Sequence, residues 1–325
     1  MSTAALVPET WHLTGDDARQ ALAHVGRRRL ILDGYTRMRY SDGFSHARSL
    51  AFLGILLFVE GVIGAIGISR VLGSATFAKA IANALESILP GPAERVLENA
   101  AGQANQAASS GYWLAIAFGT IGALVTGASL MGQIERALNR IYGIESDRDT
   151  VQKYGRAFLL ALSAGVLSVV ALGVLGLGDG FFSSFGAEGA TIYWSIARWP
   201  LGILLLIAAI ALIFRWSPRR RQPAWSWMSF GAIVAVALLV VVTAALNLFF
   251  QLSPTFGSTY GPLAGIIALA FWAFGSSIAL LVGAALAAQL EAVRAGAGAP
   301  RSVAKVVESE PGLRAVAPEG PPPVE

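Results

Sequence analysis

Long apolar stretches separated by short polar segments set the pattern of this chain. Six stretches are as long as a membrane-spanning helix, since about 20 apolar residues cross a hydrocarbon core of roughly 30 Å. They lie at about 49–69, 112–131, 157–178, 194–214, 227–250 and 263–288. A transmembrane β-barrel would show segments of about ten alternating residues instead. The pattern therefore predicts an all-α integral membrane protein with six transmembrane helices.

The composition narrows the class further. Hydrophobic residues make up 55% of the 325 residues and charged residues only 14%, whereas soluble domains carry about 25% charged residues. This balance excludes a disordered chain and argues against an ordinary soluble domain. The absence of cysteine excludes a disulfide framework, cysteine-ligated zinc and iron–sulfur clusters.

Lysine and arginine residues lie almost entirely on one side of the predicted spans. The N-terminal segment, the loops after the second and fourth spans and the C-terminal tail hold 20 of them, and the opposite side holds three. Positive charge marks the cytoplasmic side of bacterial membrane proteins. Both termini are therefore predicted to be cytoplasmic, and an odd number of spans would break the alternation.

The regions outside the spans divide the chain into three parts. Residues 1–48 form a basic cytoplasmic segment, in which 15–47 is either an amphipathic helix on the inner leaflet or a plain topology anchor. Residues 49–291 form the transmembrane domain, and 76–109 are predicted as an external helical hairpin broken at Pro90-Gly91-Pro92. Residues 292–325, rich in Pro, Gly and Ala, are predicted to be a disordered cytoplasmic tail.

Glu60 is a carboxylate near the middle of the first predicted span. Charged side chains at that depth cost a few kcal/mol, so this one must be protonated, paired or beside a water-filled cavity. It is a candidate proton or transport site; the alternative is a structural glutamic acid bonded to a neighbouring helix.

The sixth predicted span carries small residues at every fourth position. Such a stripe allows two helices to approach closely, so we interpret it as a helix-packing surface. Its members are Gly275, Ala279, Gly283 and Ala287.

The sequence offers little support for an enzyme. The three histidines, at positions 12, 24 and 46, have spacings that match no zinc site, and there is no GxSxG, Walker A or dinucleotide fingerprint. We expect no metal and no cofactor.

Four segments carry a resemblance to a known family. They are SDGFSHARSLAF at 41–52, IERALNRIYG at 134–143, FRWSPRRR at 214–221, and TYGPLAG at 259–265, continuing through Trp272 to Leu290-Glu291. Together, in order and in spacing relative to the spans, they resemble the YihY/BrkB family of bacterial inner-membrane proteins, once labelled ribonuclease BN. The resemblance covers about residues 25–295.

The resemblance implies a six-helix inner-membrane protein of unsettled function, usually described as a transporter. It adds Asn139 and Tyr260 to Glu60 as candidate transport residues. It also implies candidate polar or lipid head-group contacts on the cytoplasmic face, which are Asp42, Arg48, Arg136, Arg140, Arg220 and Glu291. The family's late Glu and Asn fall at Ala285 and Ala287, so a mechanism that needs them does not transfer. The ribonuclease label finds no supporting residues.

Two functions follow. The first is a secondary transporter or lipid translocator of the bacterial inner membrane; the second is a membrane structural or envelope-interaction protein that transports nothing. The expected partner is the lipid bilayer, with anionic lipids and a second copy of the chain as candidates, and nucleic acid is not expected. The substrate is not identifiable from the sequence.

Overall fold

The computed structural model describes residues 3–24, 26–71, 83, 89–176, 191–253, 255–261 and 263–302. Within them every regular element is a helix, and the one β-bridge joins Ala4 to Arg301. The elements are α1 Gly15–His24, α2 Arg27–Tyr40, α3 Gly43–Val71, η1 Gly91–Ala93, α5 Glu94–Ile141, α6 Thr150–Gly176, α8 Thr191–Trp216, α9 Trp225–Leu252, α10 Phe256–Tyr260 and α11 Leu263–Arg294. The all-helical prediction is confirmed for these residues.

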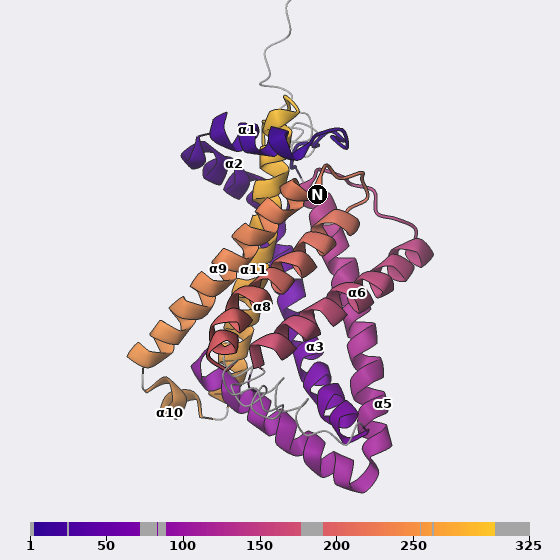
Figure 1. The fold of residues 1–325 in the computed structure, drawn as a ribbon, viewed down its shortest axis with the longest axis vertical. Helices are drawn as coiled ribbons and strands as arrows, with labels where there is room; N and C mark the ends of the chain where they lie inside the picture. Colours follow the sequence, from indigo (N-terminus) through magenta and orange to yellow (C-terminus); the bar gives the residue numbers. More distant parts are fainter. Residues whose placement is uncertain are drawn as a thin grey trace, which may run out of the picture.

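The long helices form one elongated bundle (Figure 1). Helix α11 packs against α9, α3 and α2, and α3 packs against α5. Helices α1 and α2 lie across one end of the bundle. At the opposite end lie α10 and the first part of α5, which crosses the bundle before the helix turns along it (Figure 1).

Five helices are long and apolar enough to cross a membrane. These segments are Gly43–Gly64, Thr150–Gly176, Ile192–Trp216, Trp225–Leu252 and Leu263–Arg294, and they coincide with five of the six predicted spans. The remaining predicted span, 112–131, lies inside the 48-residue helix α5, and several of its side chains are outside the described residues. Many large apolar side chains on these helices are exposed, as lipid-facing helices require.

The predicted external hairpin is described only in its second half. Residues 91–93 form the short η1 helix at the expected Pro-Gly-Pro break, and from Glu94 onward the chain continues as α5 without interruption. Most of the first half lies outside the described residues. The second half is thus an extension of the next long helix.

The small-residue stripe of α11 lies against α9. A Cβ atom at Gly283 would overlap the carbonyl oxygen of Gly231 and would lie 2.8 Å from the Cβ of Ala235. Ala279 and Ala287 are almost fully buried. One helix backbone therefore approaches the other more closely than a larger side chain would allow.

The N-terminal residues before α1 form an extended segment, 3–14, which we call the strap. Its Ala5 amide donates to the carbonyl of Pro300, and the Ser302 amide donates to the carbonyl of Thr3. Residues 292–302 therefore include the end of α11 and a segment bonded to the strap. The rest of the predicted tail, 303–325, lies outside the described residues.

The α9–α11 contact generates a stability prediction. Gly283→Ala should lower the free energy of unfolding by about 1–3 kcal/mol, the usual cost of overpacking, measured by chemical denaturation in detergent micelles. Gly165→Ala in α6 is the matched control, because a Cβ there meets nothing within 4 Å. Both variants gain the same helix propensity, so equal stabilities would contradict the close contact.

Candidate functional site: a polar cluster at one end of the bundle

The four basic segments predicted to be cytoplasmic converge at the end of the bundle where α1 and α2 lie (Figure 1). They are the N-terminal segment, the loop 142–149 between α5 and α6, the loop 217–224 between α8 and α9, and the residues around the end of α11. Three of the four family-like segments contribute to the same place. The charged and polar side chains that are buried or paired there are called the polar cluster, and they are Arg37, Glu135, Asn139, Asp147, Arg148, Lys153, Arg220, Gln289 and Glu291.

Arg37 of α2 is fully buried and joins four segments. Its Nε donates to Oε1 of Gln289 on α11 at 2.8 Å, and its Nη1 donates to the carbonyls of Ala5 in the strap and Ile141 in α5 at 2.9 and 3.0 Å. Burial lowers the pKa of Arg37 to about 10, so the guanidinium remains charged at neutral pH. The side chain thus fixes α2, α5, α11 and the strap around one positive charge.

Arg220 and Glu291 form a buried ion pair. Nη2 of Arg220 lies 2.5 Å from Oε1 of Glu291, and the two side chains are 2% and 0% exposed. The Thr10 hydroxyl donates to the same carboxylate oxygen, and Arg220 also donates to the carbonyl of Pro8. The guanidinium carbon lies 4.5 Å from the centroid of the Tyr142 ring, a cation–π contact. Burial raises the pKa of Tyr142, so this ring is neutral.

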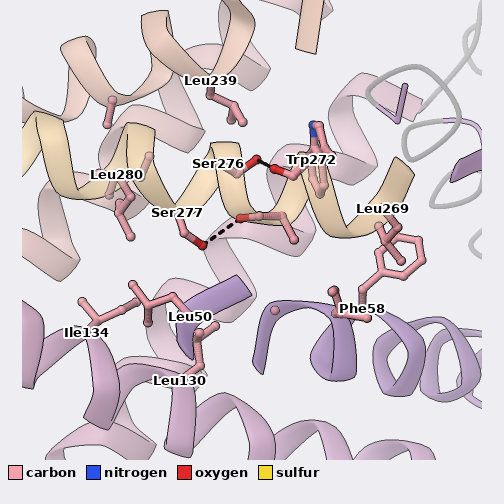
Figure 2. A pocket seen from close by; sticks show the side chains of 15 residues that line it. Leu50, Phe58, Leu130, Ile134, Leu239, Leu269, Trp272, Ser276, Ser277 and Leu280 are labelled. Carbon is pink, nitrogen blue, oxygen red and sulfur yellow. Dashed lines mark hydrogen bonds between the residues drawn. The ribbon is translucent and has the colours of Figure 1, made fainter. Parts of the chain in front are cut away.

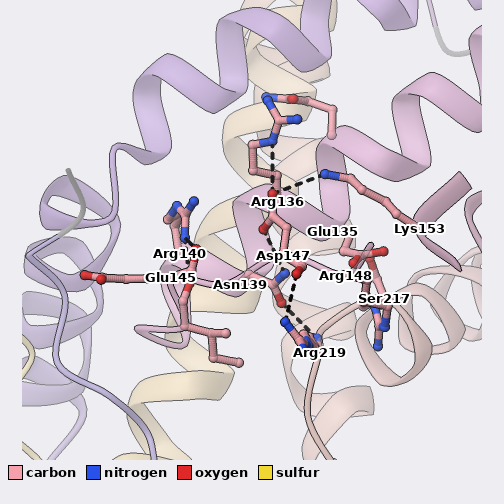
Figure 3. Close-up of polar contacts among 12 residues, drawn as sticks. Glu135, Arg136, Asn139, Arg140, Glu145, Asp147, Arg148, Lys153, Ser217 and Arg219 are labelled. Atoms are coloured by element: carbon pink, nitrogen blue, oxygen red, sulfur yellow. Dashed lines mark hydrogen bonds and ion pairs between the residues drawn. The ribbon is translucent and has the colours of Figure 1, made fainter. Parts of the chain in front are cut away.

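Asn139 connects two loops (Figure 3). Its Nδ2 donates to Asp147 at 3.3 Å, and its Oδ1 accepts from the backbone amide of Arg219 at 2.8 Å. Asp147 also lies 3.2 Å from Nζ of Lys153 and 3.5 Å from Nε of Arg136. Partial burial raises the pKa of Asp147. The hydrogen bond from Asn139 and the charge of Lys153 lower this pKa by more than burial raises it, so it lies below its usual value. Asn139 is therefore a buried connector within this end of the bundle.

A second buried ion pair lies beside this group (Figure 3). Nη1 of Arg148 lies 2.8 Å from Oε1 of Glu135, whose side chain is 1% exposed. Arg148 also donates to the carbonyls of Ser217 and Pro218, both at 2.8 Å. The pair joins the end of α5 to the loop that precedes α9.

Sequence reasoning missed Arg37, Glu135, Asp147 and Arg148. Arg37 was counted only as a positive charge, although it follows Leu30 at seven residues, the spacing of one helix face. The three others lie inside or just after the 134–143 motif, where no spacing rule distinguishes a buried ion pair from an exposed one.

The other predicted site residues lie elsewhere. Asp42 and Arg48 are exposed near the start of α3. Arg140, beside the polar cluster, donates to the carbonyls of Ile144 and Glu145. Tyr260 is 47% exposed on α10, near the opposite end of the bundle (Figure 1). The polar cluster therefore does not include Asp42, Arg48 or Tyr260.

Glu60 lies on α3 and faces α5. A Cβ atom at Gly122 would lie 3.1 Å from the Glu60 carboxyl group. One turn further along α3, Gly64 approaches Gly119 of α5 so closely that a Cβ on Gly119 would lie 2.6 Å from the Gly64 amide nitrogen. The carboxyl group therefore sits beside a tight helix crossing.

An apolar cavity of about 220 Å³ lies between the long helices. Its wall includes Leu50 and Phe58 of α3, Leu130 of α5, Leu239 of α9 and Trp272 of α11 (Figure 2). The polar side chains in its wall, Ser276 and Ser277, donate to carbonyls of their own helix. Charged side chains are absent from the described wall, and Glu60 is not part of it.

Metal-binding groups were also considered. In the described parts of the chain, no three His, Asp or Glu side chains are grouped so that they could hold a metal ion.

The helices and the buried polar cluster define a multi-pass helical membrane protein. The chain belongs to the BrkB family, since residues 35–306 match the family described as virulence factor BrkB. The resemblance seen in the sequence motifs is thereby confirmed.

Several relatives share parts of the chain. It is 23% identical to the ribonuclease-like protein YfkH of Bacillus subtilis over 79% of this chain and 93% of the relative. It is 28% identical to the UPF0761 membrane protein azo3165 of Azoarcus sp. over 76% of this chain, which spans 59% of that relative. It is 31% identical to the UPF0761 membrane protein RC1_0578 of Rhodospirillum centenum over 55% of this chain and 39% of the relative. No solved structure matches.

The buried ion pair of Arg220 and Glu291 generates a prediction. Arg220→Met should lower the free energy of unfolding by about 3–5 kcal/mol, because it leaves a buried carboxylate without its cation. The double variant Arg220→Met/Glu291→Met should recover most of that loss, since no buried charge then remains unpaired. Chemical denaturation in detergent micelles measures both.

The control for that prediction is Arg221→Met, which removes an exposed charge from the same loop and should change stability by about 0.5 kcal/mol or less. A double variant as unstable as Arg220→Met alone would contradict the interpretation of the pair.

Proposed function

We propose that this protein is a secondary transporter that moves lipid-like, amphipathic molecules within or across the bacterial inner membrane. The observation that carries the proposal is the apolar cavity between α3, α5, α8, α9 and α11. A cavity with mostly apolar walls among apolar helices favours a hydrocarbon chain over a polar solute, because the serine hydroxyls in its described wall already donate to carbonyls of their own helix.

The size of the cavity supports the same class of substrate. Its volume of about 220 Å³ is below the roughly 300–1,000 Å³ of pockets that enclose a whole drug-sized molecule. It suits part of an acyl chain while the rest of the molecule stays in the bilayer.

The head-group assignments change with the structure. Arg220 and Glu291 are buried and paired with each other, and Asn139 bonds within the protein. The exposed basic side chains at this end, Arg48 and the half-exposed Arg136, are better placed to meet an anionic head group.

The topology is part of the proposal. We infer six transmembrane helices, with α5 supplying the second span, both termini in the cytoplasm and the 76–109 segment outside. The convergence of four basic segments at one end of the bundle supports this orientation, since positive charge marks the cytoplasmic side. The bacterial inner membrane is the proposed location.

We expect no ribonuclease activity from this chain. The ribonuclease-like name belongs to YfkH. In this chain the three histidines are confined to positions 12, 24 and 46 of the N-terminal region, so they do not supply the usual constellation of a nuclease.

The cavity is tested by filling it. Gly54 lines the cavity and Gly61 does not, although both lie in α3 and a Cβ on either meets nothing within 4 Å. Gly54→Leu should abolish most of the translocation of a fluorescent phospholipid in proteoliposomes, because the new side chain occupies the path of the acyl chain. Gly61→Leu should retain wild-type transport.

The same assay, run with and without a pH gradient, tests Glu60→Gln. If Glu60 carries the coupling proton, the variant loses the response to the gradient while folding normally. Equal rates for wild type, Gly54→Leu and protein-free vesicles would overturn the proposal and favour a membrane structural protein.

A further inference from the structure

Helix α2 has one face against the bundle and one face open. Leu30, Gly34, Arg37 and Met38 are buried, and the helix packs on α11. The other face carries three large apolar side chains that are more than half exposed: Ile31 at 60%, Leu32 at 54% and Tyr35 at 53%. A helix in water would not normally present this set of side chains side by side.

Basic residues surround this open face. Arg27, Arg28, Arg29 and Arg39 are exposed. Nε of Arg29 lies 3.6 Å from Asp33, in an ion pair that leaves the arginine side chain 83% exposed. The described surface of α2 is therefore both apolar and strongly positive.

The open face continues into the lipid-facing surface of the bundle. The Tyr35 ring makes an edge contact with the Phe44 ring at 6.4 Å between centroids. Phe44 is the second residue of α3, which is apolar enough to cross the membrane from Gly43 onward. Further along α3, Phe52 is 63% exposed. Tyr35 therefore lies at the level where the span begins, the depth at which tyrosine is enriched in membrane proteins.

We propose that α2 is an interfacial helix that binds the surface of an anionic leaflet, with Ile31, Leu32 and Tyr35 inserted among the lipids and Arg28 and Arg39 on their head groups. Amphipathic helices with basic polar faces bind membranes in this way. A second copy of the chain is a poorer occupant, because its corresponding end is also rich in arginine. This inference does not depend on transport.

The chain contains no cysteine, so single labelling sites are clean. A spin label at Ile31→Cys is compared with one at Ser146→Cys, an exposed position in the α5–α6 loop at the same end of the bundle. The full-length protein is reconstituted in vesicles of phosphatidylcholine alone and in vesicles that also contain phosphatidylglycerol. Accessibility to oxygen and to a water-soluble relaxation reagent is then measured.

The expected result is an Ile31 label that is accessible to oxygen and protected from the aqueous reagent, more so with phosphatidylglycerol, while the Ser146 label stays exposed to water in both. Arg28→Gln/Arg39→Gln should remove the response to phosphatidylglycerol, and Arg221→Gln, an exposed arginine outside α2, should leave it intact. An Ile31 label as exposed to water as Ser146 in both vesicles would overturn the inference. So would an Ile31 label shielded from both reagents, which would indicate a protein contact.

Discussion

A buried guanidinium group needs hydrogen-bond acceptors or an anionic partner, and this constraint organises the end of the bundle where the polar cluster lies. An isolated charge in an apolar interior costs far more than the few kcal/mol that separate folded from unfolded chains. Arg37 meets the requirement with Gln289 and two backbone carbonyls, and Arg220 meets it with Glu291 and one more. For each arginine, the partners come from different segments, so the two side chains together fix the strap, α2, α5, α11 and the loop 217–224 relative to one another.

Between the polar cluster and the opposite end, helices meet through small residues such as Gly64 against Gly119 and Gly283 against Gly231. Packing of this kind depends on close van der Waals contact, because lipid chains are as apolar as the side chains they replace and supply no hydrophobic driving force. The apolar cavity lies in this part, between helices whose ends are held by the polar cluster. Helices that are joined at one end and line a cavity further along the bundle fit the transport function proposed above.

Much of the fold followed from the sequence, and the site followed only in part. Length and hydropathy located five helices to within seven residues at each end, since a helix that spans a membrane must be long and apolar whatever its neighbours are. The motif 134–143 carried the family resemblance, and it lies at the polar end of the bundle, where its Gly143 has a positive φ of 76° and a Cβ there would lie 2.6 Å from the Ala5 carbonyl oxygen of the strap. Arg37 could not be distinguished from exposed arginines, because its burial depends on Gln289, 252 residues away. The segment that ends at residue 302 likewise depends on strap contacts that composition does not encode.

The central claim is that Arg37 holds the strap in place, and amide hydrogen exchange of the strap in the full-length protein tests it most directly. In the wild type, the amides of Ala5, Val7 and Leu13 should exchange slowly, because each donates to a backbone carbonyl. In Arg37→Met the strap amides should lose protection while those in the middle of α9 and α11 keep it. Strap amides that exchange at the same rate in both proteins would contradict the account.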